Sequence, residues 1–290
     1  MHRIQQLTMT ALLCVTSVTA VAHHSRHAVR VRTDEPNLRS TAALVVDTTH
    51  SSVLYSRRAD VPAPIASITK LMTALVVADA DQPLNERIQL TTEDRILGKG
   101  AASRLMLGTT LSRGDLIHLA LMSSENRAAH ALGRNYPGGL PACVAAMNAK
   151  ARALGMHSAH FVDPAGLSSD NVASAEDLAK LVIAASQNPT IREYSTDRGY
   201  SVPVGRRRLE FRNTNSLVSN PSWNIIVQKT GYINEAGRCL VMQAVIHDRN
   251  VVIVLLNSVG KNTRVADAIR VRRWMEAHQS TPHSSAGDTV

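Results

Sequence analysis

Residues 66–74 read Ala-Ser-Ile-Thr-Lys-Leu-Met-Thr-Ala, and this stretch decides how the 290-residue chain is interpreted. Ser67 and Lys70 are three positions apart, so a helix would place their side chains side by side. The run Ser67–Ala80 is apolar on nearly every side, which predicts a buried helix. A serine hydroxyl is a poor nucleophile unless a base removes its proton, and lysine is such a base only where burial or positive charge lowers its pKa. The stretch therefore predicts a nucleophile and its base on one buried helix.

Two further motifs carry matching chemistry. Residues 124–126 read Ser-Glu-Asn between two expected helices, and residues 229–231 read Lys-Thr-Gly at the end of an expected strand. Each motif alone is weak evidence, because short patterns occur by chance. Only six of the 32 basic residues are lysine, however, and both motif cations are lysine. Arginine cannot act as a base at usable pH, so this choice of residue favours a catalytic interpretation.

The pattern along the chain places strands toward both ends and helices between them. Strands are expected over 42–47, 52–57, 200–204, 207–211, 224–230, 238–246 and 251–257. Helices are expected over 67–80, 115–122, 127–135, 141–154, 174–187 and 264–277. We therefore expect an α+β domain, in which an antiparallel sheet completed by distant segments is flanked by helices and joined to a mostly helical region. The apolar side of the last helix is expected to pack on the sheet rather than on a membrane.

The first residues indicate export. A short basic start is followed by an apolar run over 7–19 and by Ala-Val-Ala at 20–22, which matches the small-residue pattern of a cleavage site. A membrane-spanning helix needs about 20 apolar residues, and this run is shorter and contains threonine and serine. We therefore expect a signal peptide over 1–22 that is cleaved after Ala22.

The remaining chain divides into three parts. Residues 23–40 are polar and basic and are expected to form a mobile arm, 41–278 one catalytic domain, and 279–290 a polar tail. Two cysteines, Cys143 and Cys239, lie within the expected domain. They could pair in an oxidising compartment, although nothing local requires it.

Composition excludes several classes of protein. Hydrophobic residues make up 44% of the chain and charged residues 19%, which excludes a disordered protein. Aromatic residues make up only 3%, too few for a platform that stacks sugars or single-stranded nucleic acid. The net charge of +9 favours an anionic partner, and export argues against a nucleic-acid partner.

Four stretches resemble one enzyme family. They are Ala-Ser-Ile-Thr-Lys-Leu-Met-Thr-Ala (66–74), Leu-Met-Ser-Ser-Glu-Asn-Arg-Ala-Ala (121–129), Phe-Arg-Asn-Thr-Asn (211–215) and Lys-Thr-Gly-Tyr (229–232). In order and content they resemble the low-molecular-mass penicillin-binding proteins of the serine D-Ala-D-Ala peptidase group, which share such motifs with class A β-lactamases. The resemblance, from about residue 42 to residue 277, is greatest to the D-alanyl-D-alanine endopeptidases of this group.

This resemblance implies roles for the residues of the first two motifs. Ser67 would be the nucleophile that forms the acyl-enzyme, and Lys70 its general base. Ser124 would pass a proton toward the leaving amine, while Asn126 would orient Lys70 and the substrate amide. Lys229, from the third motif, would help to keep Lys70 neutral.

The strand motif would hold the substrate. By the same resemblance, Lys229 and Thr230 bind the terminal carboxylate of the substrate or its equivalent. Gly231 is small enough to let substrate lie along the sheet edge. The backbone N–H groups of Ser67 and Tyr232 are implied as the oxyanion hole.

The implied function is that of a periplasmic serine DD-endopeptidase, which hydrolyses D-alanyl cross-links between peptidoglycan stem peptides and is acylated by β-lactam antibiotics. No cofactor or metal is implied. Only 59 residues follow Gly231, so we expect neither the extra C-terminal β-domain nor the amphipathic membrane anchor of larger family members.

Three alternatives remain at this point. A DD-carboxypeptidase would use the same residues to trim a terminal D-Ala. A class A β-lactamase needs a glutamate that activates water, and no glutamate lies between Asn126 and Glu176. A non-catalytic wall-binding protein with this fold would need no intact nucleophile and base, and both are present.

Other polar residues are interpreted as structural. His157 and His160 are spaced like zinc ligands but lack the adjacent glutamate base of a metallopeptidase. Residues 163–167 are expected to form a structured loop beneath the site. Glu125 is expected to be solvated or paired with Arg127 rather than catalytic.

Overall fold

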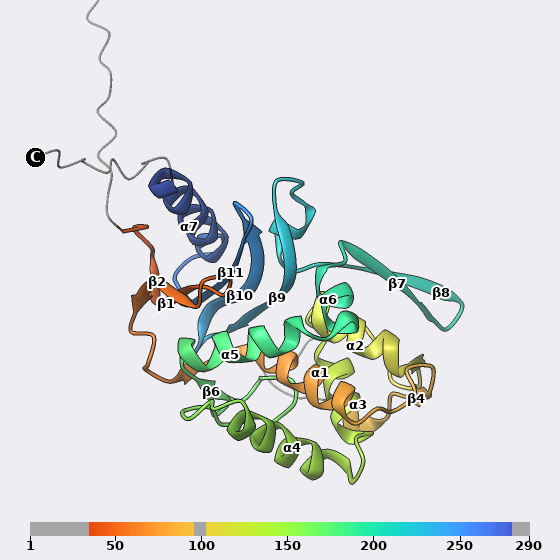
Figure 1. The fold of residues 1–290 in the computed structure, drawn as a ribbon. Coiled ribbons are helices and arrows are strands. Elements are labelled where there is room, and N and C mark those ends of the chain that lie inside the picture. The colour runs from red at the N-terminus through yellow and green to blue at the C-terminus, as the bar shows by residue number, and fades with distance from the viewer. Residues whose placement is uncertain (1–34, 96–102, 280–290) are drawn as a thin grey trace, which may run out of the picture. The chain divides into compact units, whose positions relative to one another are not determined.

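The computed structural model describes residues 35–95 and 103–279. The expected signal peptide, most of the arm and the C-terminal tail from residue 280 lie outside the described residues. The described chain is built on a five-stranded antiparallel sheet in the order β2-β1-β11-β10-β9 (Figure 1). Its strands are β1 (Ser40–Asp47), β2 (Ser52–Arg57), β9 (Asn224–Ile233), β10 (Gly237–Ile246) and β11 (Arg249–Ser258). The sheet thus joins the two ends of the domain, as the sequence pattern predicts.

Alternating side chains of the sheet enter two separate cores. On β11, Val252 and Val254 belong to the core of the helical side, whereas Val251 and Ile253 belong to the core on the opposite face. This alternation follows from the two-residue period of a strand. Helix α5 (Ala175–Ser186) covers the first face and α7 (Thr263–Gln279) covers the second (Figure 1). The prediction that the last helix packs on the sheet is confirmed.

The rest of the chain forms a mostly helical region beside the first face. Its helices are α1 (Thr69–Asp79), α2 (Arg113–Met122), α3 (Asn126–Arg134), α4 (Gly139–Ala153) and α6 (Pro189–Thr196), with 3₁₀ turns η1 (Ala66–Ile68) and η2 (Thr92–Asp94). A third 3₁₀ turn, η3 (Ser216–Ser219), places Leu217 in the core on the opposite face. Helix α1 is buried over Thr69–Val77 and contacts α2, α3, α4 and α5. The expected all-round apolar helix is therefore the centre of this region.

Three short two-stranded sheets complete the fold. They are formed by β3 (Ala63–Pro64) with β6 (Val172–Ala173), β4 (Arg87–Gln89) with β5 (Thr110–Ser112), and β7 (Gly199–Val204) with β8 (Arg207–Arg212). The β7–β8 hairpin was expected from the sequence, and it extends away from the helices in Figure 1. The other two pairs have strands of two or three residues, too short to produce a recognisable period.

Helix α6 is the main element that the sequence pattern does not predict. It begins with Pro189 directly after α5, and proline usually signals the end of a helix. Here the proline occupies the first turn of a new helix, where its missing N–H costs nothing. The Asn188 side chain caps this turn by accepting a hydrogen bond from the N–H of Ile191 at 3.1 Å.

Within the described ranges, no helix combines the length and the apolar character that crossing a membrane requires.

Candidate active site

The predicted site residues meet where three elements converge. Ser67 lies in η1 just before α1, residues 124–126 form the junction of α2 and α3, and residues 229–232 lie on β9. They surround a cavity of about 270 Å³, whose lining residues are Ser67, Ser124, Asn126, Leu167, Thr214, Thr230, Gly231, Tyr232 and Arg264. The lysines of the first and third motifs are fully buried next to it. The structure therefore brings all the sequence-predicted residues together.

Lys70 is held by three acceptors. Its Nζ donates hydrogen bonds to Ser67 Oγ at 2.8 Å, to Asn126 Oδ1 at 2.8 Å and to the carbonyl of Ala165 at 2.6 Å. A neutral amine keeps two N–H donors and gains one lone pair. The amide and carbonyl oxygens can only accept, so they retain the two N–H groups and leave the lone pair for the Ser67 hydroxyl. The site is therefore arranged for transfer of the serine proton to the lysine.

Burial supplies the neutral amine that this transfer needs. Burial lowers the pKa of Lys70 from 10.5 to about 7, although the negative charges of Asp163 and Glu125 act in the opposite direction. Near neutral pH a large fraction of Lys70 is therefore deprotonated. An ordinary exposed lysine would be almost entirely charged.

Lys229 is the second buried cation. Its Nζ donates to Ser124 Oγ at 2.9 Å and to the carbonyl of Thr230 at 2.8 Å. Burial, followed by the positive charges of Lys70 and Arg264, lowers the pKa of Lys229 well below its ordinary value. Burial is the main cause of the low pKa of Lys70, and a positive charge on either lysine opposes a positive charge on the other.

The backbone around the nucleophile is tightly constrained. Ala66 and Ser124 have φ values of +49° and +62°, a left-handed conformation that side-chain-bearing residues seldom adopt. Such strain persists only where surrounding contacts enforce it, and it clusters at functional sites. In this chain the two strained residues are Ala66, which precedes the nucleophile Ser67, and Ser124, which carries the hydroxyl of the second motif.

Gly231 is required by packing. A Cβ atom there would lie 2.8 Å from the Ile65 carbonyl and 3.2 Å from the backbone N of Ser67. From the sequence, Gly231 was expected to leave room for a substrate along the sheet edge. The structure adds a second requirement, because β9 packs directly against the turn that carries Ser67 and leaves no space for a side chain. This contact also brings the backbone on either side of the expected oxyanion hole close together.

The Tyr232 side chain is 50% exposed, and its ring lies beneath the Arg238 guanidinium at 4.5 Å.

The loop at 163–167 supports the site as predicted. The Asp163 carboxylate accepts hydrogen bonds from the backbone N–H groups of Ala165, Gly166 and Ser168 at 2.6–3.0 Å and from Asn171 Nδ2 at 2.6 Å. These contacts fix the Ala165 carbonyl that binds Lys70. A carboxylate engaged in this way is a structural acceptor.

Glu125 was expected to be solvated or paired with Arg127, and the structure shows it buried and bonded to the backbone N–H of Arg127. It is only 6% exposed, and its carboxylate caps α3 by accepting the backbone N–H of Arg127 at 3.3 Å. Packing of α2 against α3 buries this junction residue.

Sequence reasoning missed two residues that line the cavity. Thr214 Oγ1 lies 2.6 Å from Thr230 Oγ1, and Arg264 Nη1 donates to the Gly231 carbonyl at 2.9 Å. The segment 211–215 was noted as similar to the family, but nothing in it singled out the threonine. Arg264 is one of several arginines on α7, and only the fold places it beside β9.

The remaining candidates do not form a second centre. In the part of the chain that the structure describes, no group of three His, Cys, Asp or Glu side chains could hold a metal ion, and His157 and His160 belong to no such group. Cys143 and Cys239 are both buried and free.

Comparison with known proteins agrees with this geometry. The family model described as D-alanyl-D-alanine carboxypeptidase matches residues 29–260. The chain is 49% identical over 249 residues to the D-alanyl-D-alanine endopeptidase of Pseudomonas aeruginosa, covering 85% of this chain and 80% of the relative. It is 46% identical over 266 residues to the D-alanyl-D-alanine endopeptidase of Escherichia coli K12, covering 90% and 85%. The crystal structure of the Streptomyces K15 DD-transpeptidase superimposes with a TM-score of 0.78 at 26% identity, covering 84% of this chain and 99% of that structure.

Proposed function

The chain belongs to the D-alanyl-D-alanine carboxypeptidase family, and on that premise we propose that it is a serine DD-endopeptidase that hydrolyses D-alanyl cross-links between peptidoglycan stem peptides. The preference for cross-links over terminal D-Ala comes from the two relatives at 46–49% identity, both of which are named endopeptidases. Family membership makes the protein a peptidase that works through an acyl-enzyme.

One observation carries the chemistry. The lone pair of a neutral Lys70 has a single partner among its three contacts, the Ser67 hydroxyl 2.8 Å away, and burial brings the pKa of this lysine to about 7. Lys70 takes the proton as Ser67 attacks the D-alanyl carbonyl, and the backbone N–H groups of Ser67 and Tyr232 receive the developing negative charge.

The other residues complete the reaction. Ser124, which accepts a hydrogen bond from Lys229 at 2.9 Å, relays to the leaving amine the proton that Lys70 took from Ser67. Asn126 holds Lys70 and the substrate amide. Thr230 and Lys229 bind the carboxylate on the leaving residue. Arg264, whose guanidinium reaches the Gly231 carbonyl, adds positive charge on the same side.

Export and domain organisation are part of the proposal. A signal peptide over 1–22 would direct the enzyme to the periplasm, where its substrate lies, and residues 41–278 would form the catalytic domain. Cleavage would remove Arg3 and lower the net charge from +9 to +8, which suits an anionic wall polymer.

Penicillin is expected to form a long-lived adduct on Ser67. A β-lactam presents a strained carbonyl to the same oxyanion hole, so acylation proceeds as with a peptide. Deacylation is slow, because no glutamate follows the second motif before Glu176 and Asp163 is committed to its loop. A fluorescent penicillin should give one labelled band in the wild type and none in Ser67→Ala. Rapid turnover of penicillin without a labelled band would instead indicate a β-lactamase.

A muropeptide digest tests the proposed substrate. Purified cross-linked dimers should become monomers when treated with the wild-type enzyme, as followed by chromatography, and should stay intact with Ser67→Ala. Release of terminal D-Ala with the dimers unchanged would make the protein a carboxypeptidase.

A further inference from the structure

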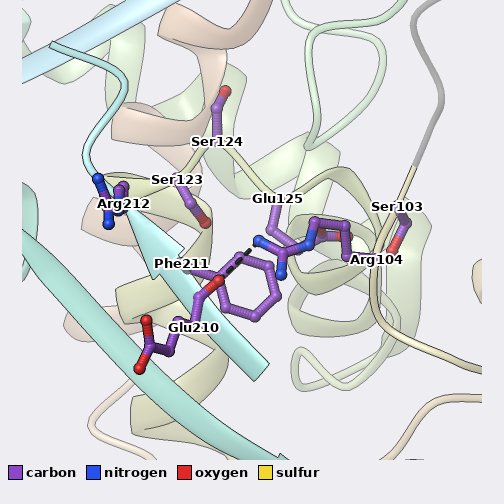
Figure 2. Close-up of a pocket in the computed structure, with 8 residues that line it drawn as sticks. All are labelled: Ser103, Arg104, Ser123, Ser124, Glu125, Glu210, Phe211 and Arg212. Carbon is purple, nitrogen blue, oxygen red and sulfur yellow. Dashed lines mark hydrogen bonds between the residues drawn. The ribbon is translucent and has the colours of Figure 1, made fainter. Parts of the chain in front are cut away.

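A second and larger hollow adjoins the catalytic cavity. It has a volume of about 740 Å³, and its lining residues are Ser103, Arg104, Ser123, Ser124, Glu125, Glu210, Phe211 and Arg212 (Figure 2). Ser124 lines both this hollow and the cavity that contains Ser67. The two spaces therefore share one wall, and that wall is the hydroxyl-bearing turn of the second motif.

The hollow continues along the β7–β8 hairpin. A third space of about 460 Å³ shares Glu210, Phe211 and Arg212 with it and extends to Arg198. Both hollows lie along β8, and together their lining residues extend from Ser124 to Arg198. We call this pair of hollows the hairpin groove.

Positive charge is presented along the hairpin groove. The Arg104 guanidinium lies 4.5 Å from the centre of the Phe211 ring, and its Nη1 donates to the Glu210 carbonyl at 2.7 Å. This backbone contact uses one of the five N–H donors of a guanidinium, so Arg104 is held in position with donors to spare. Arg212 is exposed at the other side of the hollow.

The two acidic residues do not cancel these arginines. Glu125 is buried, and its carboxylate caps α3 through the N–H of Arg127. Figure 2 shows the Glu210 carboxylate turned away from the Arg104 guanidinium, which it contacts through its backbone carbonyl only. A ligand in the groove would therefore meet the guanidinium groups of Arg104 and Arg212, of which the first is not neutralised by Glu210, and guanidinium groups pair bidentately with carboxylates.

The position of the groove indicates which part of a substrate it would receive. In the proposed reaction Ser124 passes a proton to the leaving amine, so the leaving group begins next to Ser124, the residue that also lines the larger hollow. A carboxypeptidase releases a single D-Ala from this side. An endopeptidase releases a whole stem peptide, which needs a path away from the cavity and carries free carboxylates.

We propose that the hairpin groove binds the leaving-side stem peptide of a cross-link, with Arg104 and Arg212 pairing with its carboxylates. The proposal rests on the endopeptidase function and deepens it. Binding energy from this peptide would favour cross-links over terminal D-Ala, because only a cross-linked substrate reaches the two arginines.

The first test compares two reactions of the same enzyme. For each variant we would measure kcat/KM for a cross-linked dimer and the second-order rate of acylation by penicillin, which has no leaving-side peptide. The ratio of the two should fall about tenfold in Arg104→Gln/Arg212→Gln. Arg212→Gln alone should lower it in the same direction without disturbing the Arg104–Phe211 stacking. Arg208→Gln removes an exposed charge from the same strand, where the guanidinium binds Ser201, and should leave the ratio unchanged.

A second substrate identifies the interacting group. A synthetic dimer keeps the carboxylate on the leaving residue, which Thr230 and Lys229 bind, but carries amides in place of the other free carboxylates of its leaving-side peptide. The wild type should cleave it more slowly than the natural dimer. The double variant should cleave both dimers at the same rate, because the partners of the carboxylates are gone.

The possible failures are distinguishable. If the wild type cleaves dimers but the ratio is unchanged in the double variant, or if that variant still distinguishes the amidated dimer, the groove assignment is wrong and the endopeptidase function stands. If the wild type releases only terminal D-Ala, the endopeptidase function fails and the groove assignment fails with it.

Discussion

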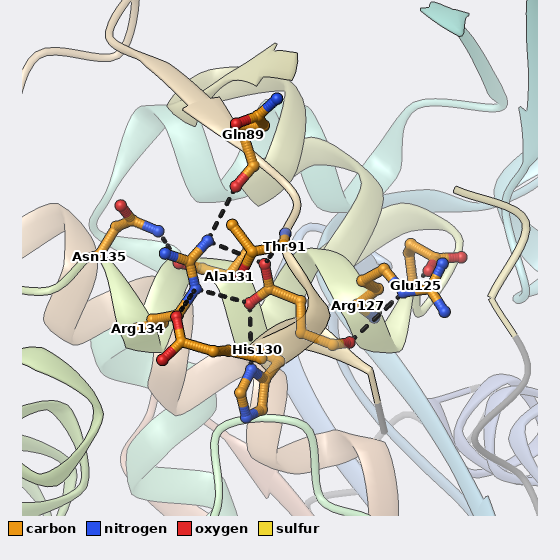
Figure 3. Close-up of polar contacts among 10 residues, drawn as sticks. Gln89, Thr91, Glu125, Arg127, His130, Ala131, Arg134 and Asn135 are labelled. Atoms are coloured by element: carbon orange, nitrogen blue, oxygen red, sulfur yellow. Dashed lines mark hydrogen bonds and ion pairs between the residues drawn. The ribbon is translucent and has the colours of Figure 1, made fainter. Parts of the chain in front are cut away.

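Two buried polar clusters in this fold, one around Asp94 and one around Ser67, differ in whether their titratable group stays charged. In the Asp94 cluster, the fully buried carboxylate of Asp94 accepts hydrogen bonds from Arg134 at 2.8 and 3.0 Å, from the N–H of Thr91 at 2.8 Å and from His130 at 3.2 Å. Figure 3 shows these contacts, with Thr91, His130 and Arg134 labelled. Burial alone would raise the pKa of Asp94, but these hydrogen bonds outweigh it and lower the pKa to about 2.

The Ser67 cluster contains the two lysines Lys70 and Lys229, and the hydroxyl, amide and carbonyl oxygens that they bind are all uncharged. Lys70 donates to Ser67, Asn126 and the Ala165 carbonyl, and nearby carboxylates act on it only at longer range. The effect of burial therefore exceeds the effect of these carboxylates, and the pKa of Lys70 falls to about 7.

The same direction of shift has opposite meanings in the two clusters. A lowered pKa keeps an acid charged and makes a base neutral. The Asp94 cluster is consequently a fixed ion pair that joins η2 to α3, whereas the Ser67 cluster holds an amine that can accept a proton near neutral pH. The presence or absence of a directly bonded opposite charge separates a structural cluster from a reactive one.

Removing the base should have the largest effect. Lys70→Ala is expected to lower the acylation rate by about 10³-fold, the contribution of a positioned base, with the fold retained. Lys70→Arg should restore little, because the requirement is for a removable proton rather than for charge. A time course of labelling with fluorescent penicillin measures both, and Lys180→Ala, a lysine outside the cavity, is the control. Acylation by Lys70→Arg near the wild-type rate would contradict the base assignment.

Breaking the structural cluster should affect stability instead. Asp94→Ala leaves Arg134 without its buried partner and is expected to lower the free energy of unfolding by about 3 kcal/mol. Denaturant unfolding would measure this loss. Glu93→Ala, in the same turn but with its side chain 73% exposed, should change stability by less than about 1 kcal/mol. Equal losses in the two variants would mean that the Asp94 cluster contributes no more than a surface pair.

A change at Gly231 should disturb the enclosure of the Ser67 cluster. Gly231→Ala places a Cβ 2.8 Å from the Ile65 carbonyl, and such overpacking is expected to cost about 2 kcal/mol and to slow acylation by moving Ser67. Gly114→Ala is a suitable control, since its Cβ would meet its nearest neighbours at 3.4 Å. Wild-type stability and acylation in Gly231→Ala would show that β9 is not pressed against the turn of Ser67.

The sequence predicted the Ser67 cluster much better than the Asp94 cluster. Ser67 and Lys70 lie three positions apart on the consecutive elements η1 and α1, a spacing that places neighbouring side chains together, and the other two motifs are contiguous triplets. Asp94 and Arg134 are 40 positions apart and belong to no motif, so only tertiary packing brings them together. Arg264, 33 positions after Gly231, was missed for the same reason.

The fold shows the same division. The central strands and longest helices have periods that the sequence reveals, and all of them are present. Helix α6 was missed because Pro189 can either end one helix or begin the next, and its capping contact decides between them only in three dimensions. The burial of Glu125 likewise depends on how α2 and α3 pack.

The pH dependence of acylation tests the central claim most directly, because it measures the protonation state of Lys70 during the reaction. Below the pKa of Lys70 the amine carries a proton and cannot accept one from Ser67, so the second-order rate with penicillin should rise with pH. The account predicts an increase of about tenfold per pH unit between pH 5 and 6.5, a midpoint at about 7 and a plateau by pH 9. A rate that is constant from pH 5 to 9, or one still rising tenfold per unit at pH 9 as for an ordinary lysine, would contradict it.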